Sequence, residues 1–204
     1  MNLGSKSSKD CYKSISAPSK GLYKDKGSKF LSFAYPIESE DEAKAIISDI
    51  KKEYFDARHH CWAYRIGLSG EPFRYNDDGE PSSTAGKPIY GQLLSNELSD
   101  ILIVVVRYFG GTLLGTSGLI VAYKSASADA IANATIIEKT ATVRCRAEFE
   151  YLQMNAVMKF LKDWQLTPKN TVFDNGCSLE VDVPLSREDA FLESMNKICI
   201  CKRV

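Results

Sequence analysis

Apolar side chains in the first quarter of the chain follow two different periods in succession. Residues 21–37 alternate like two strands, and Lys26-Gly27 between them suits a tight turn because Gly adopts positive φ angles freely. Behind the capping-box sequence Ser39-Glu40-Asp41-Glu42, apolar residues recur at helical spacing from residue 40 to about residue 55. The pattern predicts a β-hairpin followed by a helix with one buried face.

Glycine and proline divide the middle of the chain into short elements. Residues 61–67 suit a strand, whereas residues 71–81 are polar, hold two prolines and predict a surface loop. A helix is expected over residues 84–94. Residues 101–106 are Ile, Leu and Val without polar alternation, which predicts a strand at the centre of a sheet with both faces buried.

A glycine-rich turn follows this buried strand. Residues 107–118 contain four glycines and lead into small and apolar side chains at helical spacing from Leu119 to Ala130. Small residues allow a helix to pack closely on a sheet. We therefore expect the strand, the turn and the helix to form one unit.

The pattern restarts near residues 135–141. The segments that follow are predicted in the order β-α-β-β-α-β, as residues 143–149, 154–164, 167–173 and 179–183, a helix from Ser186-Arg187-Glu188-Asp189, and residues 199–204. This order is that of a ferredoxin-like fold. The predicted class is α+β, with a basic leader at residues 1–20, a first domain at residues 21–138 and a ferredoxin-like domain at residues 139–204.

Charge is unevenly distributed, although 26 basic and 26 acidic residues sum to zero. Residues 1–30 carry seven Lys against two Asp, so the leader is either a source of affinity for RNA or a solvated tail. No apolar h-region follows it. The longest apolar run, residues 101–106, is far shorter than the about 20 residues of a membrane span. We expect a cytoplasmic protein without membrane contact.

The two histidines and six cysteines are candidate metal ligands and nucleophiles. His59, His60 and Cys61 are consecutive, but neighbouring residues of a strand point to opposite faces, so they cannot all meet one metal or substrate without a bulge. We favour a structural or ligand-orienting role for one histidine, with Cys61 in the core. The cysteines lack regular spacing, so reduced thiols and no bound metal are expected.

Three carboxylates lie within four residues at Asp77, Asp78 and Glu80. Such a loop could hold a divalent cation or act as paired acid and base. It lacks the alternating ligand pattern of a calcium loop, and the carboxylates could instead cap the next helix and pair with Arg58 or Arg107. We favour structural pairing.

The glycine-rich turn lies where a strand leads into a helix, a position at which free backbone N–H groups can hold an anion. It has neither the Lys-Ser/Thr pair of a P-loop nor the dinucleotide-binding spacing. The glycines either contact phosphate or only allow tight packing. The orientation of Arg107 and Lys124 would decide between the two.

Several segments taken together resemble the signature of the YigZ/IMPACT family. They are residues 56–64, 76–81, 84–88 and 105–115. The resemblance covers about residues 20–135 and implies a left-handed βαβ fold, like that of a ribosomal-protein domain. It also implies that the second domain is akin to late domains of elongation factor G. Ser83 and Ser117 stand where the family usually has Gly.

The resemblance links the chain to regulation of translation, which eukaryotic family members carry out. We therefore expect a regulatory protein that binds RNA, the ribosome or a translation factor, without a cofactor and without DNA. The residues expected to contact the ligand are Arg58, His60, Arg107, Gly110, Gly111, Gly115, Gly118 and Lys124. Asp77, Asp78 and Glu80 are expected to orient the arginines through charge-assisted hydrogen bonds.

Two other functions are compatible with the same residues. In a hydrolase acting on a small phosphorylated substrate, His60 and the carboxylates would serve as acid and base, and a metal requirement would favour this hypothesis. In a protein-interaction module, the signature surface would contact a partner without any small ligand. The enzymatic role is the less favoured hypothesis. Involvement in translation is itself a hypothesis, because it rests on likeness of fold.

Overall fold

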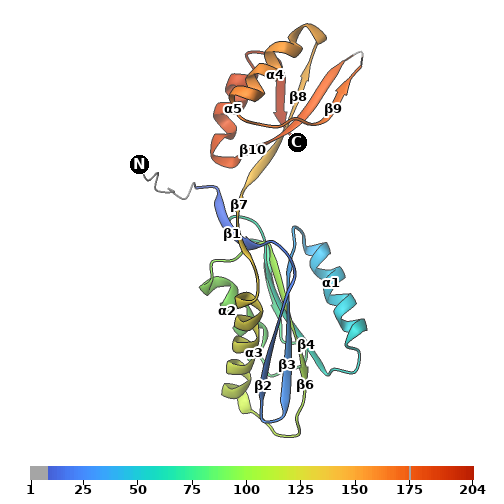
Figure 1. The fold of residues 1–204 in the computed structure, drawn as a ribbon, viewed down its shortest axis with the longest axis vertical. Coiled ribbons are helices and arrows are strands. Elements are labelled where there is room, and N and C mark those ends of the chain that lie inside the picture. Colours follow the sequence, from blue (N-terminus) through green and yellow to red (C-terminus); the bar gives the residue numbers. More distant parts are fainter. Residues whose placement is uncertain (1–8, 175) are drawn as a thin grey trace. The chain divides into compact units, whose positions relative to one another are not determined.

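The computed structural model describes residues 9–174 and 176–204, which form two compact units (Figure 1). One unit consists of residues 12–139, and the other joins the described residues up to Cys11 to residues 140–204. Each unit encloses hydrophobic core of its own. Within the described part of the chain, no helix is long and apolar enough to cross a membrane.

The first unit is built on a five-stranded antiparallel sheet with the strand order β2-β3-β6-β4-β5. The strands are β2 (Ser19–Asp25), β3 (Ser28–Pro36), β4 (His59–Arg65), β5 (Phe73–Asn76) and β6 (Ile101–Tyr108). Its helices are α1 (Glu40–Glu53), α2 (Gly86–Ser95) and α3 (Gly115–Ala132). Helix α1 covers one face of the sheet, and α2 and α3 cover the other (Figure 1).

The central position predicted for residues 101–106 is confirmed, because β6 lies between β3 and β4. Ile103 and Val105 belong to the core beneath α2 and α3, whereas Val104 and Val106 belong to the core beneath α1. Both faces of this strand are therefore buried, as the absence of polar alternation indicated. Side chains alternate along a strand, so Arg107 points to the same face as Val105.

The predicted hairpin and first helix are also confirmed. Lys26 and Gly27, both with positive φ, join β2 to β3. The Ser39 side chain accepts a hydrogen bond from the Glu42 backbone N–H at 3.2 Å, immediately before α1. The prediction of a loop over residues 71–81 was wrong in part, because β5 pairs there with the edge of β4. Strand β5 is only four residues long and all four are exposed, so it leaves no alternation of buried and exposed side chains in the sequence.

Part of the expected leader takes part in the fold. Strand β1 (Cys11–Ile15) pairs with β7 (Ile136–Thr140) in a two-stranded sheet. The buried Asp10 carboxylate accepts hydrogen bonds from the Ser186 backbone N–H at 2.9 Å and from the Ser186 hydroxyl at 2.5 Å. Residues 1–8, which include Lys6, the first lysine of the leader, lie outside the described residues.

The second unit has the ferredoxin-like order that the sequence predicted. Its strands form a four-stranded sheet in the order β11-β8-β10-β9, covered on one face by two helices (Figure 1). The elements are β8 (Thr142–Phe149), η1 (Tyr151–Gln153), α4 (Met154–Asp163), β9 (Lys169–Phe173), β10 (Cys177–Pro184), η2 (Leu185–Arg187), α5 (Glu188–Met195) and β11 (Ile200–Arg203).

One local prediction in this unit was wrong. Ser186 does not cap the last helix, because a single 3-10 turn, η2, comes first and α5 begins only at Glu188. The Ser186 hydroxyl and N–H are directed to Asp10 instead. A partner 176 positions away in the sequence thus replaces the local cap.

Candidate functional site

The register between β4 and β6 decides which histidine faces the candidate site. His59 is paired with Arg107 across the two strands, so both side chains lie on the face covered by α3. His60 points to the other face, where its Nε2 donates to the Tyr54 carbonyl oxygen at 3.0 Å. The two neighbouring histidines therefore belong to different environments.

Arg107 is the centre of a buried polar network. Its Nη1 donates to Glu80 Oε1 at 2.6 Å, and the side chains of Arg107 and Glu80 are only 6% and 3% exposed. The Tyr123 hydroxyl donates to the same Glu80 oxygen at 2.8 Å. Cys61 Sγ lies 3.3 Å from the Tyr123 hydroxyl oxygen. Burial raises the pKa of both the Tyr123 hydroxyl and the Cys61 thiol, so both stay protonated at neutral pH.

Two aromatic rings flank the Arg107 guanidinium. Its Cζ lies 5.5 Å from the ring centre of Phe30 and 5.6 Å from that of Phe109. Such rings hold the guanidinium plane in place and favour its positive charge. Arg107 Nε is buried and has no hydrogen-bond partner within the described residues. One donor of an otherwise fixed guanidinium is therefore buried without an acceptor among the described residues.

A cavity of about 390 Å³ opens beside this network. Its wall combines charged groups, the start of α3 and apolar side chains. The lining residues are Arg58, His59, Glu80, Pro81, Arg107, Phe109, Leu113, Leu114, Gly115, Thr116 and Leu119. A small number of polar groups set in an apolar wall is the usual composition of a ligand-binding cavity.

Helix α3 begins at the cavity without a side-chain cap. Leu114, the residue before the helix, cannot accept a hydrogen bond through its side chain, and none caps the helix. The first N–H groups of a helix have no partner inside it, and the helix dipole makes this end positive. Arg58, also at the cavity, is exposed, and no acidic partner is found for it in residues 9–174 and 176–204.

The carboxylates of the loop before α2 serve three separate purposes. Asp77 accepts from the backbone N–H groups of Ala85 and Gly86, at 3.0 and 2.8 Å, and so caps α2. Asp78 pairs with Lys51 at 2.8 Å. Burial acts to raise the pKa of Asp78, but hydrogen bonds from Lys51 and from the His60 backbone outweigh it and lower the pKa. Only Glu80 orients an arginine, and the described residues hold no metal-binding cluster of three His, Cys, Asp or Glu side chains.

The structure brings together only part of the set that the sequence proposed. Arg58, Glu80, Arg107 and Gly115 line one cavity. The proposed residues that do not line it are His60, Asp77, Asp78, Gly110, Gly111, Gly118 and Lys124. Lys124 is exposed on α3, and Gly110 packs so closely on Gly27 that a Cβ there would lie 2.0 Å from the Gly27 carbonyl carbon.

Sequence reasoning missed the residues that complete the cavity. They are His59, Pro81, Phe109, Leu113, Leu114, Thr116 and Leu119. For His59 a signal existed, because strand alternation places it on the same face as Cys61, which was expected in the core. For the exposed Phe109 and Leu113 the signal was their place at the glycines of the turn: Phe109 directly precedes Gly110, and Leu113 lies between Gly111 and Gly115.

Comparison with known proteins identifies the chain's relatives. The family model described as "Impact N-terminal domain" matches residues 26–131. The chain belongs to the IMPACT family. It is 33% identical over 168 residues to the IMPACT family member YigZ of Escherichia coli (strain K12), covering 81% of this chain and 82% of that protein. Over 171 residues it is 32% identical to the IMPACT family member YvyE of Bacillus subtilis (strain 168), covering 84% and 79%.

The likeness extends over both units. A crystal structure titled as that of a hypothetical protein is 29% identical to this chain, with a TM-score of 0.73, over 96% of this chain and 98% of the other. The segment matched by the family model, called the IMPACT domain below, contains every residue that lines the cavity beside Arg107. The candidate site is therefore part of the region by which the family is defined.

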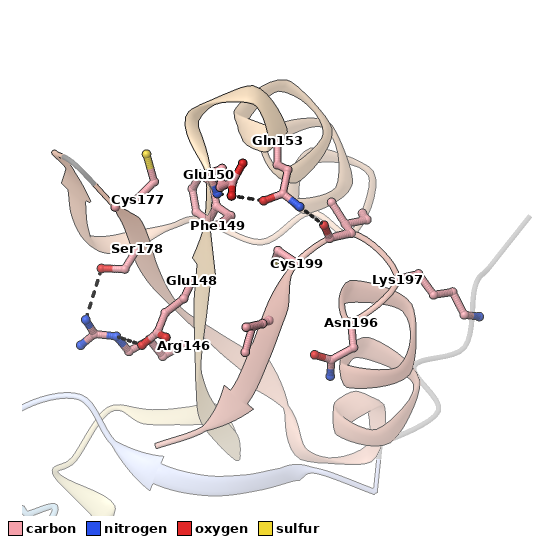
Figure 2. A pocket seen from close by; sticks show the side chains of 13 residues that line it. Arg146, Glu148, Phe149, Glu150, Gln153, Cys177, Ser178, Asn196, Lys197 and Cys199 are labelled. Carbon is pink, nitrogen blue, oxygen red and sulfur yellow. Dashed lines mark hydrogen bonds and ion pairs between the residues drawn. The ribbon is translucent and has the colours of Figure 1, made fainter.

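A larger cavity, of about 760 Å³, lies in the ferredoxin-like unit, outside the IMPACT domain (Figure 2). Its arginine is paired with a carboxylate: Arg146 Nε lies 3.3 Å from Glu148 Oε1, and Arg146 Nη2 donates to the Ser178 hydroxyl at 3.3 Å. Like Arg107 Nε, Arg146 Nε is buried without a hydrogen-bond partner among the described residues. Glu148 and Glu150 balance the charges of Arg146 and Lys197 on its wall. Size alone would favour this cavity, but its paired charges make it the weaker candidate for binding an anion.

Proposed function

We propose that this IMPACT family member is a regulatory protein associated with translation, and that its IMPACT domain binds RNA through a phosphate group. The observation that carries the proposal is the Arg107 guanidinium, which is buried, fixed by Glu80 on one nitrogen and without a partner at Nε. A phosphate oxygen is the acceptor that such a donor suits, and arginine binds phosphate through geometry as well as charge.

Two further groups support an anion at the same place. The uncapped start of α3 supplies N–H groups and a positive dipole end, equivalent to roughly half an elementary charge. Exposed Arg58 adds a full positive charge at the cavity. Against these stands one carboxylate, Glu80, whose Oε1 already accepts from Arg107 and Tyr123. The balance of charge at the cavity favours an anion.

The translational setting follows from the family. The IMPACT domain is shared with eukaryotic relatives, such as the protein IMPACT homologue of Dictyostelium discoideum, which is 37% identical over 95 residues. This chain covers only 27% of that protein, so the partner of the longer protein is not assigned to this chain. From the family we infer only the process, which is translation. The chemical nature of the ligand is inferred from the geometry of the cavity.

The same geometry weakens the hydrolase hypothesis. Glu80 Oε1 already accepts hydrogen bonds from Arg107 and Tyr123, so this oxygen is engaged within the buried network. His59 Nδ1 donates to the Asp78 carbonyl oxygen at 2.9 Å, because a carbonyl oxygen only accepts. His60, the residue expected to act as acid or base, lies on the other face of the sheet. Of the titratable groups described at the cavity, Glu80 and His59 thus each already have a hydrogen-bond partner within the protein.

Cosedimentation with ribosomes tests the proposal. Purified protein is mixed with ribosomes, which are then sedimented through sucrose at low and at physiological salt, because contacts to phosphate weaken as salt rises. The variants are Arg58→Ala and Arg107→Lys, which change the cavity, and Lys124→Ala, which removes an exposed cation on α3 outside it. We expect both cavity variants to lose cosedimentation and Lys124→Ala to retain it.

Two results would overturn the proposal. One is equal cosedimentation of all variants and the parent, which would place any ribosome contact elsewhere on the chain. The other is absence of cosedimentation at both salts together with no binding of ribosomal RNA in solution. In that second case a protein partner, such as a translation factor, becomes the hypothesis to pursue.

A further inference from the structure

The charge of the IMPACT domain does not suit an extended RNA-binding surface. Its residues, 26–131, carry eleven basic and fourteen acidic side chains. Proteins that follow a nucleic-acid backbone use rows of lysine and arginine, each neutralising one phosphate. At this cavity only Arg58 and Arg107 are available, together with the start of α3. The local charge matches one phosphate group rather than several.

The depth of Arg107 restricts which phosphate can reach it. Its side chain is 6% exposed, so a group that contacts Nε has to enter the cavity. The cavity volume of about 390 Å³ lies toward the lower end of the range for small-molecule pockets, roughly 300–1,000 Å³. An internal phosphodiester carries a nucleoside on each side, whereas a terminal phosphate carries only one. The space therefore suits a terminal phosphate.

The hydrogen-bond donors of Arg107 suit one oxyanion, bound along the Nε side of the guanidinium. Glu80 occupies Nη1 of Arg107, whereas Nε has no partner in residues 9–174 and 176–204. Two oxygens of a phosphate can bind side-on to Nε and the neighbouring nitrogen of a guanidinium, as a pair of parallel hydrogen bonds. Glu80 and the two flanking rings prevent the guanidinium from turning away. Arg107 is thus preorganised for this contact.

The apolar side of the cavity indicates what is attached to the phosphate. Phe109 and Leu113 line it and are 49% and 82% exposed, although both are large hydrophobic side chains. An exposed aromatic ring beside phosphate donors is the arrangement with which proteins bind an unpaired base. Inorganic phosphate or a phosphorylated side chain would leave this apolar side uncovered.

We propose that the cavity binds a nucleoside phosphate monoester, with the phosphate on Arg107 Nε and the start of α3, and the nucleoside against Phe109 and Leu113. The inference rests on the site of the proposed function and names the chemical class of its ligand. This chemistry has two sources, a free nucleotide and a phosphorylated RNA end. The experiment includes both.

Competition for a fluorescent RNA tests the inference. The probe is a single-stranded RNA of roughly ten nucleotides with a 5′-phosphate, and binding to the full chain is followed by fluorescence anisotropy. The competitors are the same RNA with a 5′-hydroxyl, the same RNA with a 3′-phosphate, adenosine monophosphate and inorganic phosphate. We expect at least one terminal phosphate to strengthen binding by roughly ten- to hundredfold over the hydroxyl form.

The variants assign the effect to the cavity. Arg107→Lys keeps a positive charge beside Glu80 and removes the Nε donor, so it should bind phosphorylated and hydroxyl RNA equally. Leu113→Asp changes a side chain that is 82% exposed, and its carboxylate should also abolish the preference for phosphate. If Arg107→Lys fails to fold, Leu113→Asp still tests the cavity, because Leu113 is exposed and its replacement does not disturb the core. Lys124→Ala, outside the cavity, should keep the preference.

The outcomes separate this inference from the proposed function. Ribosome cosedimentation that depends on Arg58, combined with no preference for a terminal phosphate, overturns the inference and leaves the proposed function standing. Binding of adenosine monophosphate without any RNA binding supports the inference and overturns the proposed function. Inorganic phosphate that competes as strongly as the nucleotide overturns the assignment of the nucleoside. A phosphate preference that survives in Leu113→Asp overturns the inference.

Discussion

At the scale of single residues, Arg107 combines a structural and a ligand-binding role. A buried ion pair contributes little net stability by itself, because both charges lose their hydration. Removing one partner is costly, because the other charge then remains buried without a counterion. If Arg107 were replaced, the Glu80 carboxylate would lose its counterion and keep only the hydrogen bond from the Tyr123 hydroxyl. The guanidinium proposed to bind phosphate is therefore held in place by contacts that also stabilise the folded domain.

The first prediction concerns this pair. Arg107→Ala should lower the free energy of unfolding by about 3–5 kcal/mol, because it leaves the Glu80 carboxylate buried without its counterion. Arg58→Ala should change it by less than about 0.5 kcal/mol, because Arg58 is exposed and without an acidic partner among the described residues. Urea unfolding followed by circular dichroism measures both. Similar values for the two variants would contradict the buried network.

A second prediction concerns Ser83. Its φ is +63°, in the left-handed region that favours glycine. Ser83→Gly should stabilise the protein by about 0.5–1 kcal/mol, because relief of roughly 1–2 kcal/mol of backbone strain exceeds the entropy that Gly loses on folding. Ser82→Gly, the neighbouring position without positive φ, should destabilise it by about 0.4–1 kcal/mol. Thermal unfolding of both variants checks the opposite signs.

At the scale of elements, a contact between two turns holds the cavity loop in place. Gly110, at the start of the glycine-rich turn, packs on Gly27 at the tip of the β2–β3 hairpin. The Gly110 backbone N–H also donates to the Ser28 hydroxyl at 3.1 Å. Phe109 and Leu113 belong to the same loop. Gly110 does not line the cavity itself, but its packing positions Phe109 and Leu113, which do.

The third prediction compares two glycines. Gly110→Ala should destabilise the protein by about 1–3 kcal/mol or more, because its Cβ would lie 2.0 Å from the Gly27 carbonyl carbon and 2.2 Å from the Ser28 backbone nitrogen. Gly91→Ala should stabilise it by about 1 kcal/mol, because Gly91 lies within α2 and nothing comes within 4 Å of the added carbon. Urea unfolding measures both. A mild effect of Gly110→Ala would show that the two turns can separate.

At the scale of the whole molecule, the early residues contribute to both compact units. Within the first, the Tyr12 hydroxyl donates to Asp100 at 2.5 Å, and β1 pairs with β7. Within the second, Asp10 binds Ser186 and its carbonyl oxygen accepts from the Ala141 N–H at 2.8 Å. The basic segment that the sequence suggested as a leader is therefore also a structural segment from residue 10 onward.

The fourth prediction follows from these contacts. Deleting residues 1–20 should lower the thermal stability of the protein, because it removes β1 and leaves the Ser186 N–H and the buried Asp100 carboxylate with fewer partners. The single change Asp10→Ala should lower the free energy of unfolding by about 1–2 kcal/mol, because it removes the hydrogen bonds from Ser186 to a carboxylate. Differential scanning calorimetry measures both. An unchanged melting temperature of the deletion variant would contradict a structural role of residues 10–20. Any loss of RNA binding by that variant would then result from the removed positive charges.

The sequence by itself determined the elements whose signals are local. The turn at Lys26-Gly27, the cap at Ser39 and the buried strand of residues 101–106 each depend on neighbouring residues, and all three are confirmed. The order of elements in the second unit was sufficient to predict a ferredoxin-like fold. Four signature blocks were sufficient to predict the family. These predictions required no knowledge of which distant residues meet.

Only the tertiary structure decided which residues form the cavity. Strand alternation separates His59 from His60, but the choice between them depends on which face of the sheet α3 covers. Likewise, Glu80 rather than Asp77 or Asp78 reaches Arg107, 27 positions away. Ser186 bonds to Asp10 instead of capping α5. In each case the partner is distant in sequence, and packing of whole elements determines the distance between the two side chains.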